Sequence, residues 1–308
     1  MKKSNLITKL LQLIVKNKDI REFKNNFFYY IFFRLFRKFF NSNIKIRIEN
    51  FYIYASNQKN KTSHALLKKC NFDDQNELML IKKISRNKKI FLLDCGCNYG
   101  FYSFFTASLS EQNSIVSIDA SPTIVEDFKK NLILNNFNNV TIKNFAVSDT
   151  DDLTVVFNES KNDWESSLNH KQFENLKSTK VKTSKIDTLL GHINLEDYFL
   201  FIKLDIEGNE LQAIKGAINI VQKYNPIFII ELSQYILEKN YDNFNFLKLF
   251  LDKFDYGIYD INKKNVMPDE IIKLLNNLDS KHRTIGNYYL VKNDKNIKDL
   301  FKNDKSSR

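Results

Sequence analysis

The stretch FLLDCGCNYG, residues 91–100, decides the fold. Its apolar residues lead to Asp94 and then to a turn that contains Gly96 and Gly100, and the residues that follow have the composition of a helix. Strand, glycine turn and helix therefore come in the order that is typical of parallel α/β sheets. A turn that binds phosphate offers backbone N–H groups, and a carboxylate such as Asp94 would repel that ligand. The acid instead favours a nucleotide-like ligand that carries positive charge.

The segments around this unit alternate between strand and helix. Buried strands are predicted at 88–95, 114–121, 140–148, 198–205 and 226–232, and helices at 122–136, 210–224 and 243–254. Two further strands, 257–262 and 284–293, flank a short helix at 268–277, and such a closing pair is unlike a plain dinucleotide-binding fold. The chain is therefore predicted to be an α/β protein with one catalytic domain, residues 44–292.

Some segments of this domain depart from the alternation. Residues 44–55 have the pattern of a strand pair, and residues 73–85 have the apolar spacing of a helix. Residues 148–192 form a less regular stretch with one strand candidate, 153–158, and the single tryptophan of the chain. A long irregular insertion near the C-terminal edge of a sheet is commonly functional.

The excess positive charge lies at the two ends of the chain. Residues 1–43 carry ten basic and two acidic side chains, residues 291–308 carry six and three, and the residues between them carry 31 of each. The neutral body argues against a protein that binds nucleic acid. We therefore predict a basic, aromatic-rich helical extension at 1–43 and a basic flexible tail at 293–308.

The N-terminal extension leaves two interpretations open. It begins like a secretory signal, but a lysine interrupts its apolar run and no small-residue cleavage site follows, so we expect no cleavage. The segment 27–40 mixes aromatic and basic residues and is too short to span a bilayer, which takes roughly 20 apolar residues. It suits either an interfacial helix in peripheral contact with an anionic membrane or a helical cap on the catalytic body. The odd number of cysteines favours a cytoplasmic location. If the segment is an interfacial helix, the protein would lie on the inner face of the membrane.

S-Adenosylmethionine has the chemistry that the glycine turn favours, because it has no phosphate and its ammonium and sulfonium groups attract a carboxylate. Asn98 stands between the glycines and tolerates left-handed backbone angles. Asp119 ends the next strand, 19 residues past Gly100, where a ribose-binding acid is expected at about 20 residues. The alternative for Asp119 is an acid that complements the N-terminus of the helix beginning at Pro122. Asn144 and Ala146 lie near the end of the third strand, where an adenine edge would lie. The predicted cofactor-binding residues are therefore Asp94, Gly96, Asn98, Gly100, Asp119, Asn144 and Ala146.

A second cluster lies in FIKLDIEGNELQAIKGA, residues 201–217. Asp205 and Glu207 follow a buried strand at its carboxyl end, where ligands bind in open α/β sheets, and Glu231 ends the next strand on the same edge. We predict these three residues to be catalytic, because carboxylates there could position a hydroxyl and take its proton. Glu210 is interpreted as complementing the dipole of the following helix. The three acids could also bind Mg²⁺, but the predicted site contains no metal, since carboxylates at strand edges more often form hydrogen bonds.

Taken together, these motifs resemble the FkbM family of S-adenosylmethionine-dependent methyltransferases over roughly residues 75–235. The resemblance rests on LLDCGCNYGFYS, SIDASP, NFAVSD, the serine loop ending at Ser167, and IKLDIEGNELQAIKGA followed by PIFIIEL. It implies a Rossmann-like class I methyltransferase fold, with a mostly parallel seven-stranded sheet, helices on both faces and an antiparallel closing strand. It also implies cofactor contact by the acids and the glycine turn, and catalytic carboxylates around the reacting hydroxyl. One departure is that the family usually has Glu-Pro where this chain has Asp119-Ala120-Ser121-Pro122.

The resemblance implies O-methylation of a hydroxyl on a sugar, a glycan or a related small molecule. One alternative is an NAD-dependent oxidoreductase, which would share the strand, turn and helix and Asp119 but would not explain Asp94. The other is a membrane-docked interaction module with a vestigial cofactor site, which the basic aromatic N-terminus favours and the set of carboxylates disfavours. A nucleic-acid methyltransferase is disfavoured, because the sequence has no Asn/Asp-Pro-Pro-aromatic motif.

Overall fold

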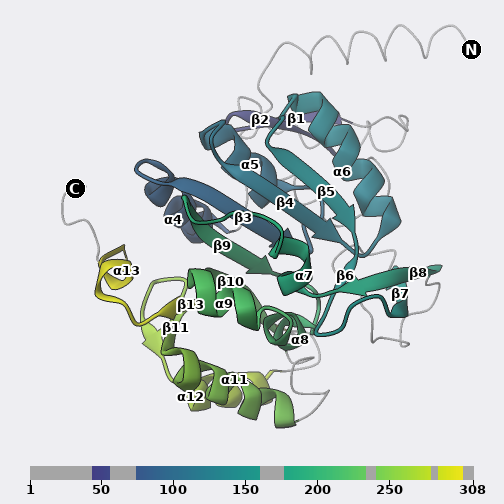
Figure 1. Ribbon diagram of the computed structural model, residues 1–308. Helices are drawn as coiled ribbons and strands as arrows, with labels where there is room; N and C mark the ends of the chain where they lie inside the picture. Colours follow the sequence, from purple (N-terminus) through teal and green to yellow (C-terminus); the bar gives the residue numbers. More distant parts are fainter. Residues whose placement is uncertain (1–43, 56–73, 160–176, 234–240, 279–283, 301–308) are drawn as a thin grey trace, which may run out of the picture.

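A computed structural model of the chain describes residues 44–55, 74–159, 177–233, 241–278 and 284–300 (Figure 1). The N-terminal extension at 1–43, with its membrane and cap interpretations, lies outside the described residues, as do Ser167 and the tryptophan. No helix within the described ranges is both long enough and apolar enough to cross a membrane.

One large mixed sheet forms the centre of the molecule. Its strands are β3 (Lys89–Cys95), β4 (Ser114–Asp119), β5 (Val140–Asn144), β9 (Tyr198–Leu204), β10 (Ile227–Ser233), β11 (Tyr256–Asp260), β12 (Asn265–Val266) and β13 (Thr284–Lys292). Their order is β12-β11-β13-β10-β9-β3-β4-β5, and β13 runs antiparallel to both β10 and β11. The five neighbouring strands β10, β9, β3, β4 and β5 run parallel to one another. The predicted α/β fold with an antiparallel closing strand is therefore confirmed.

The sheet has one strand more than the seven predicted. The extra strand, β12, is two residues long and pairs only with β11 within the described part of the chain. A tight turn produces it, because Lys263 has a positive φ of 66° and Asp260 bonds with Lys264 through both its backbone N–H and its carboxylate. A hairpin this short has no hydrophobic pattern that a sequence could reveal.

Two hydrophobic cores cover the two faces of the sheet. Side chains that alternate along β3 and β9 go to opposite faces, as the two-residue period of a strand requires. The face of Leu93 and Ile202 packs against α7 (Ile186–Leu190), α8 (Glu210–Lys215), α9 (Ile218–Tyr224), α11 (Tyr241–Phe254) and α12 (Pro268–Asn276). The face of Leu92 and Phe201 packs against α4 (Gln75–Ser85), α5 (Phe101–Leu109) and α6 (Pro122–Asn135). Lys203 shares this second face with Phe201, two residues before it.

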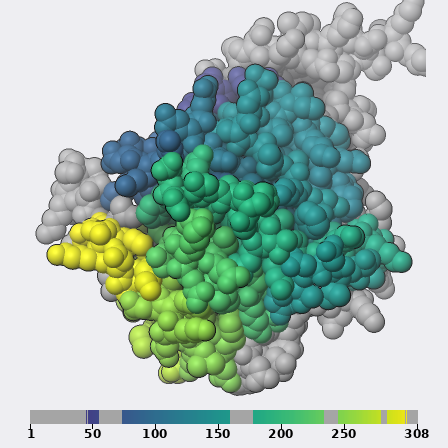
Figure 2. Space-filling model, viewed as in Figure 1, coloured from purple at the N-terminus to yellow at the C-terminus, as the bar shows by residue number. Residues whose placement is uncertain are grey.

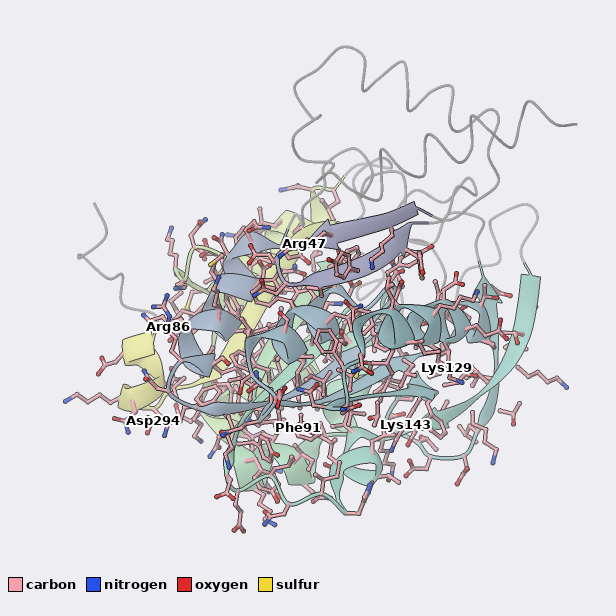
Figure 3. The ribbon with its side chains drawn as sticks, turned by 90° about the horizontal axis from the view of Figure 1, so that it is seen from above. Arg47, Arg86, Phe91, Lys129, Lys143 and Asp294 are labelled. Atoms are coloured by element: carbon pink, nitrogen blue, oxygen red, sulfur yellow. The ribbon has the colours of Figure 1, made fainter. Side chains whose placement is uncertain are left out.

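The predicted strand pair at 44–55 is confirmed as the hairpin β1 (Ile44–Ile48) and β2 (Phe51–Ala55). The backbone N–H groups of Tyr52 and Tyr54 donate to the side chains of Asn135 and Asn131 on α6, at 2.6 and 2.8 Å. Figure 3 shows the hairpin on the outer side of the helical layer that covers this face of the sheet.

Helix α6 begins as predicted, with Pro122 in its first turn. The side chain of Ser121 caps the helix by accepting from the N–H of Ile124 at 3.2 Å. The acid that precedes this cap, Asp119, is therefore not the capping residue itself. Its carboxylate binds the turn between strand and helix instead, as described below.

Two predicted elements are interrupted. The strand predicted at 140–148 divides into β5 and β6 (Ala146–Val147), and β6 pairs with β8 (Lys177–Ser184) in a separate sheet of order β6-β8-β7. The helix predicted at 210–224 divides into α8 and α9 at Gly216. A Cβ at Gly216 would lie 2.2 Å from the carbonyl oxygen of Ser148, so the helix breaks where another chain segment passes close to it.

The less regular stretch contains more regular structure than predicted. The candidate strand at 153–158 is confirmed as β7 (Thr154–Glu159), but β8 and α7 were not predicted. Strand β8 is mostly polar, and only Val181 joins the small apolar cluster beneath this sheet, so the hydrophobic signal for it is weak. Figure 2 shows the surface that β7 and β8 present beside the α/β body.

A short helix also lies in the segment that was predicted to be a flexible tail. Helix α13 (Lys295–Leu300) follows β13, and Ile297 packs against the hydrophobic core on the α4 face. Figure 2 shows α13, in yellow, at the margin of the described body, and Figure 3 places Asp294 on the same side of the molecule as Arg86. This part of the tail is therefore anchored by an apolar contact.

Candidate active site

The glycine turn leads from β3 into α5 with three left-handed residues. The φ angles are 74° at Gly96, 48° at Asn98 and 87° at Gly100. The N–H groups of Gly96 and Cys97 donate to the carbonyl oxygen of Ile118 at 2.9 and 3.1 Å, so the turn is fixed to the end of β4. The prediction that Asn98 takes up a left-handed conformation is confirmed.

Both glycines are required by contacts within the protein. A Cβ on Gly96 would lie 1.8 Å from the carbonyl oxygen of Asp205, and one on Gly100 would lie 2.5 Å from the ring of Phe104. Their positive φ angles would also be strained for any residue with a side chain. The turn therefore brings the ends of β3 and β9 into direct contact, and this contact explains why the acids of the two predicted clusters lie close together.

Asp94 is fully buried and makes its contacts inside the protein. Its Oδ2 accepts a hydrogen bond of 2.6 Å from the hydroxyl of Ser103, and its Oδ1 lies 3.8 Å from Nζ of Lys203. Burial raises the pKa of Asp94, and the ammonium and the hydroxyl oppose that shift. The carboxylate of Asp94 is thus enclosed by Ser103 and Lys203, and the contact of Asp94 with the cofactor stays a prediction.

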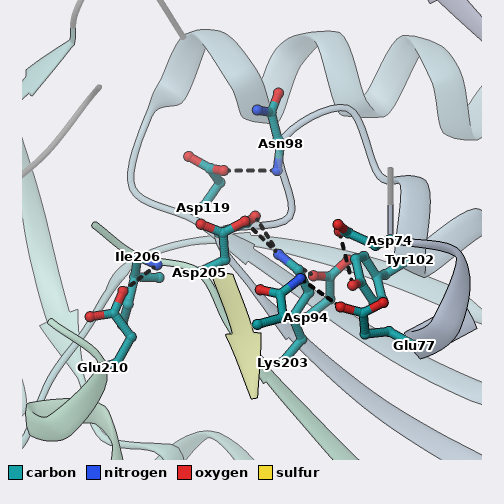
Figure 4. Close-up of polar contacts among 12 residues, drawn as sticks. Asp74, Glu77, Asp94, Asn98, Tyr102, Asp119, Lys203, Asp205, Ile206 and Glu210 are labelled. Atoms are coloured by element: carbon teal, nitrogen blue, oxygen red, sulfur yellow. Dashed lines mark hydrogen bonds and ion pairs between the residues drawn. The ribbon is translucent and has the colours of Figure 1, made fainter. Parts of the chain in front are cut away.

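Lys203 is the site residue that the sequence reasoning missed. It is 5% exposed, and its Nζ lies 3.1 Å from Oδ2 of Asp205 and 3.4 Å from the carbonyl oxygen of Gly96 (Figure 4). It also lies over the ring of Tyr102, 5.0 Å from the ring centre. Burial lowers the pKa of Lys203, but the carboxylates of Asp205 and Asp94 outweigh burial and raise it, so the ammonium stays charged. The available signal was a lysine inside an otherwise apolar strand, because a buried ammonium needs anionic partners.

Asp119 lies at the end of β4 and holds the turns on either side of it. Its Oδ2 accepts from the N–H of Asn98 at 3.1 Å, and its Oδ1 accepts from the N–H of Ser121 at 2.9 Å. Burial raises the pKa of Asp119 to about 6, against the lowering effect of these two amides. Each carboxylate oxygen retains a second lone pair that a ligand hydroxyl could use.

The other predicted adenine-side residues have structural contacts. The side-chain amide of Asn144 donates to the carbonyl oxygens of Asp119 and Ala120, at 2.8 and 3.0 Å, and so braces the end of β4. Ala146 is buried in β6, in the small cluster that also contains Phe157 and Val181. The structure therefore puts Asn144 in contact with Asp119, while Ala146 belongs to the neighbouring small sheet.

The three predicted catalytic carboxylates are brought together. Asp205, Glu207 and Glu231 each place an oxygen within 4.8 Å of the others at the carboxyl end of β9 and β10. Glu207 has a φ of 54° and Gly208 one of 94°, so a tight turn directs the chain back toward α8. Oxygen atoms this close could bind a metal ion, and the predicted absence of a metal stays a prediction.

Glu231, which belongs to this cluster, and Glu210, which lies near it, both have raised pKa values. Burial, the nearby carboxylates of Asp205 and Glu210, and a hydrogen bond with Asp205 raise the pKa of Glu231 well above its usual range. Burial also raises the pKa of Glu210 to about 7, although its Oε1 accepts from the N–H groups of Ile206 and Gly208 at 3.0 and 3.1 Å. Glu210 thus folds back onto the turn before α8, and the surroundings of Glu231 favour its protonated form.

The turn also presents an unsatisfied acceptor. The side-chain oxygen of Asn98 is buried and has no hydrogen-bond partner within the described ranges. A buried acceptor without a partner costs roughly 1–3 kcal/mol, which a ligand with N–H or O–H donors would recover. Together with Asp119, this atom makes the turn fit a ligand that is rich in hydrogen-bond donors.

Comparison with known families identifies the domain. Residues 94–258, more than half of the chain, match the methyltransferase FkbM domain. The chain belongs to the FkbM methyltransferase family. The match begins at Asp94 and includes both predicted clusters of acids, so the predicted family is confirmed. No curated protein sequence is significantly similar to the chain.

The chain also matches solved structures of methyltransferases, at low sequence identity. The FkbM methyltransferase of Methylobacillus flagellatus KT is 17% identical with a TM-score of 0.40, over 66% of this chain and 43% of that one. The O-methyltransferase of Bacillus cereus, in complex with SAH, is 14% identical with a TM-score of 0.40, over 72% and 81%. Precorrin-6y C5,15-methyltransferase of Geobacter metallireducens GS-15 is 11% identical with a TM-score of 0.35, over 71% and 88%. The present chain thus spans less than half the length of the M. flagellatus protein.

Proposed function

We propose that this FkbM family member is an S-adenosylmethionine-dependent O-methyltransferase whose acceptor is a hydroxyl of a sugar, a glycan or a related small molecule. The observation that carries the proposal is the convergence of Asp205, Glu207 and Glu231 at the sheet edge next to the glycine turn. Carboxylates accept hydrogen bonds from hydroxyls, and a group of them suits an acceptor with several hydroxyls and no negative charge.

The cofactor would lie against the glycine turn. Asp119 would accept hydrogen bonds from the ribose hydroxyls, and the buried amide oxygen of Asn98 would accept from a donor of the ligand. The carboxylates around Lys203 favour a ligand with a positive charge over a pyrophosphate. S-Adenosylmethionine supplies an activated methyl group when bound, so the enzyme has chiefly to align the acceptor oxygen with it.

Asp205 is the proposed general base. Its side chain is 39% exposed, and Lys203 holds one of its oxygens from the protein side. In the transfer, the bond from sulfur to the methyl carbon breaks, the bond from the acceptor oxygen to that carbon forms, and the hydroxyl proton passes to Asp205. Glu231, whose raised pKa favours the protonated form, would donate or accept a hydrogen bond and so orient the acceptor.

A binding and transfer experiment tests the function. Calorimetry on the full-length chain in EDTA should detect S-adenosylmethionine and no NAD. Label from S-adenosylmethionine with a radioactive methyl group should then pass to members of a panel of neutral sugars and glycans. Binding of NAD instead would favour the oxidoreductase, and binding of neither would favour the interaction module. Transfer that occurs only after Mg²⁺ is restored would contradict the prediction of a site without metal.

The pH dependence of cofactor binding tests the role of Asp119. The ionised carboxylate accepts the ribose hydroxyls, so binding should be strongest above the pKa of about 6 and should weaken as Asp119 is protonated. We expect affinity about tenfold lower at pH 5 than at pH 7.5, since each pH unit below the pKa removes up to a factor of ten. Calorimetry at a series of pH values measures it.

Two variants separate Asp119 from its neighbours. Asp119→Asn should bind more weakly at pH 7.5 and lose the pH dependence near 6. Glu210→Gln removes a second acid of the site, whose pKa is about 7, and should keep that dependence. A pH profile that disappears in Glu210→Gln and persists in Asp119→Asn would show that Asp119 is not the ribose ligand.

A further inference from the structure

Lys203 connects the two halves of the site. It lies in β9 on the face opposite Ile202 and Leu204, and it is almost completely buried. A buried ammonium is costly unless anions and hydrogen-bond acceptors surround it. A lysine at this position therefore requires a specific set of partners.

Its partners come from four different segments. Nζ lies 3.8 Å from Asp94 in β3, 3.4 Å from the carbonyl oxygen of Gly96 in the glycine turn and 3.1 Å from Asp205 after β9, and over the ring of Tyr102 in α5 (Figure 4). The backbone reinforces this arrangement, because the N–H of Asp205 donates to the carbonyl oxygen of Cys95 at 3.2 Å. The ammonium thus joins the cofactor turn to the proposed base.

The charges of Lys203 and Asp205 nearly cancel for a ligand at some distance, because the two groups form a dipole at a separation of 3.1 Å. Removing either one changes the net charge of the site by one unit, while Asp94 remains on the buried side of Lys203. S-Adenosylmethionine carries a positive sulfonium, whereas its product, S-adenosylhomocysteine, has a neutral thioether at the same position. A single charge near the sulfur therefore changes the affinity for the two ligands differently.

We propose that Lys203 is a positioning residue of the methyl transfer: it fixes Asp205 beside the glycine turn, and the balance of their two charges sets how strongly the site prefers the sulfonium cofactor to its neutral product. The inference rests on the proposed function, since it requires that S-adenosylmethionine binds at this turn. In this proposal Lys203 does not touch the acceptor. It acts by holding Asp205 in place and by its charge, which changes the affinity of the site for the cofactor.

The test is the ratio of the affinities for S-adenosylmethionine and S-adenosylhomocysteine, measured by calorimetry in EDTA on the full-length chain. Asp205→Asn removes one negative charge beside the ammonium and should lower the preference for S-adenosylmethionine by about tenfold. Lys203→Met should raise that preference by about tenfold, and the double variant should return to within about threefold of the original ratio. Lys203→Arg keeps the charge and should keep the ratio.

Controls separate this inference from other effects. Lys130→Met removes an exposed lysine that pairs with Asp127 on α6, and it should leave the ratio unchanged. If Lys203→Met does not fold, Asp205→Asn still gives a result, because the Asp205 side chain is partly exposed. Unchanged ratios in Asp205→Asn and in every folded Lys203 variant would overturn the inference, whereas failure of the original chain to bind either ligand would overturn the proposed function.

Discussion

Replacing Gly96 with alanine should lower the free energy of unfolding by about 2–5 kcal/mol and abolish cofactor binding. The new Cβ would lie 1.8 Å from the carbonyl oxygen of Asp205, at a φ of 74°. A left-handed conformation costs a residue with a side chain about 1–2 kcal/mol, and overpacking adds about 1–3 kcal/mol. Relief of the clash would also separate the turn from the end of β9. Denaturant unfolding and calorimetry with S-adenosylmethionine measure the two effects.

Gly286→Ala is the matched control. Gly286 has a positive φ of 100°, but a Cβ there would meet nothing within 4 Å. This variant should therefore show the conformational cost alone, about 1–2 kcal/mol, and should bind the cofactor normally. Equal and mild effects in the two variants would mean that the turn and β9 do not need their close contact.

The variant Asp205→Asn should lose a factor of about 10²–10⁴ in kcat, because an amide cannot take the acceptor proton. The substitution keeps the shape of a partly exposed side chain but removes an anionic partner of the buried Lys203, so the thermal midpoint should fall and the rate is measured well below it. The rate of methyl transfer is measured with an acceptor from the neutral panel, at saturating cofactor. The affinity for the cofactor is followed separately, because the loss of one negative charge beside Lys203 is expected to weaken it.

Two further variants are compared with Asp205→Asn. Glu231→Gln should cost less than Asp205→Asn, since the surroundings of Glu231 favour its protonated form and an amide can replace that form as a hydrogen-bonding group. Asp269 has a side chain that is 71% exposed and pairs with Lys248, outside the proposed site. The control variant Asp269→Asn should therefore leave the rate unchanged. Full turnover in Asp205→Asn, or a larger loss in Glu231→Gln, would reassign the base.

Much of the fold follows from local patterns in the sequence. The apolar run before Asp94, the glycines after it and the proline at the start of α6 each determine local geometry, and the structure has the strand, turn and helix that they predict. The convergence of Asp205, Glu207 and Glu231 was predictable for a similar reason, because parallel strands end at one edge of a sheet.

Other features depend on contacts between distant parts of the chain. Lys203 lies 107 residues from Gly96, and only the packing of β9 against β3 makes it a neighbour of the turn. The break at Gly216 depends on the passage of Ser148, and the role of Asn144 depends on carbonyl groups of Asp119 and Ala120. Residue type alone could not predict that Asp94 would be enclosed by protein, because its burial results from Ser103 and Lys203.

The position of β13 has a consequence for the order in which the protein is made. Residues Thr284–Lys292 are inserted between β10 and β11, so both of those strands have an unpaired edge on the ribosome until this late segment emerges. Glu231 pairs in register with Asn287, and Asn287 also donates to Glu77 at 2.8 Å. A nascent chain that already holds every acidic residue of the proposed site is thus still incomplete at the sheet edge beside Glu231 until residues Thr284–Lys292 have been made and have paired with β10.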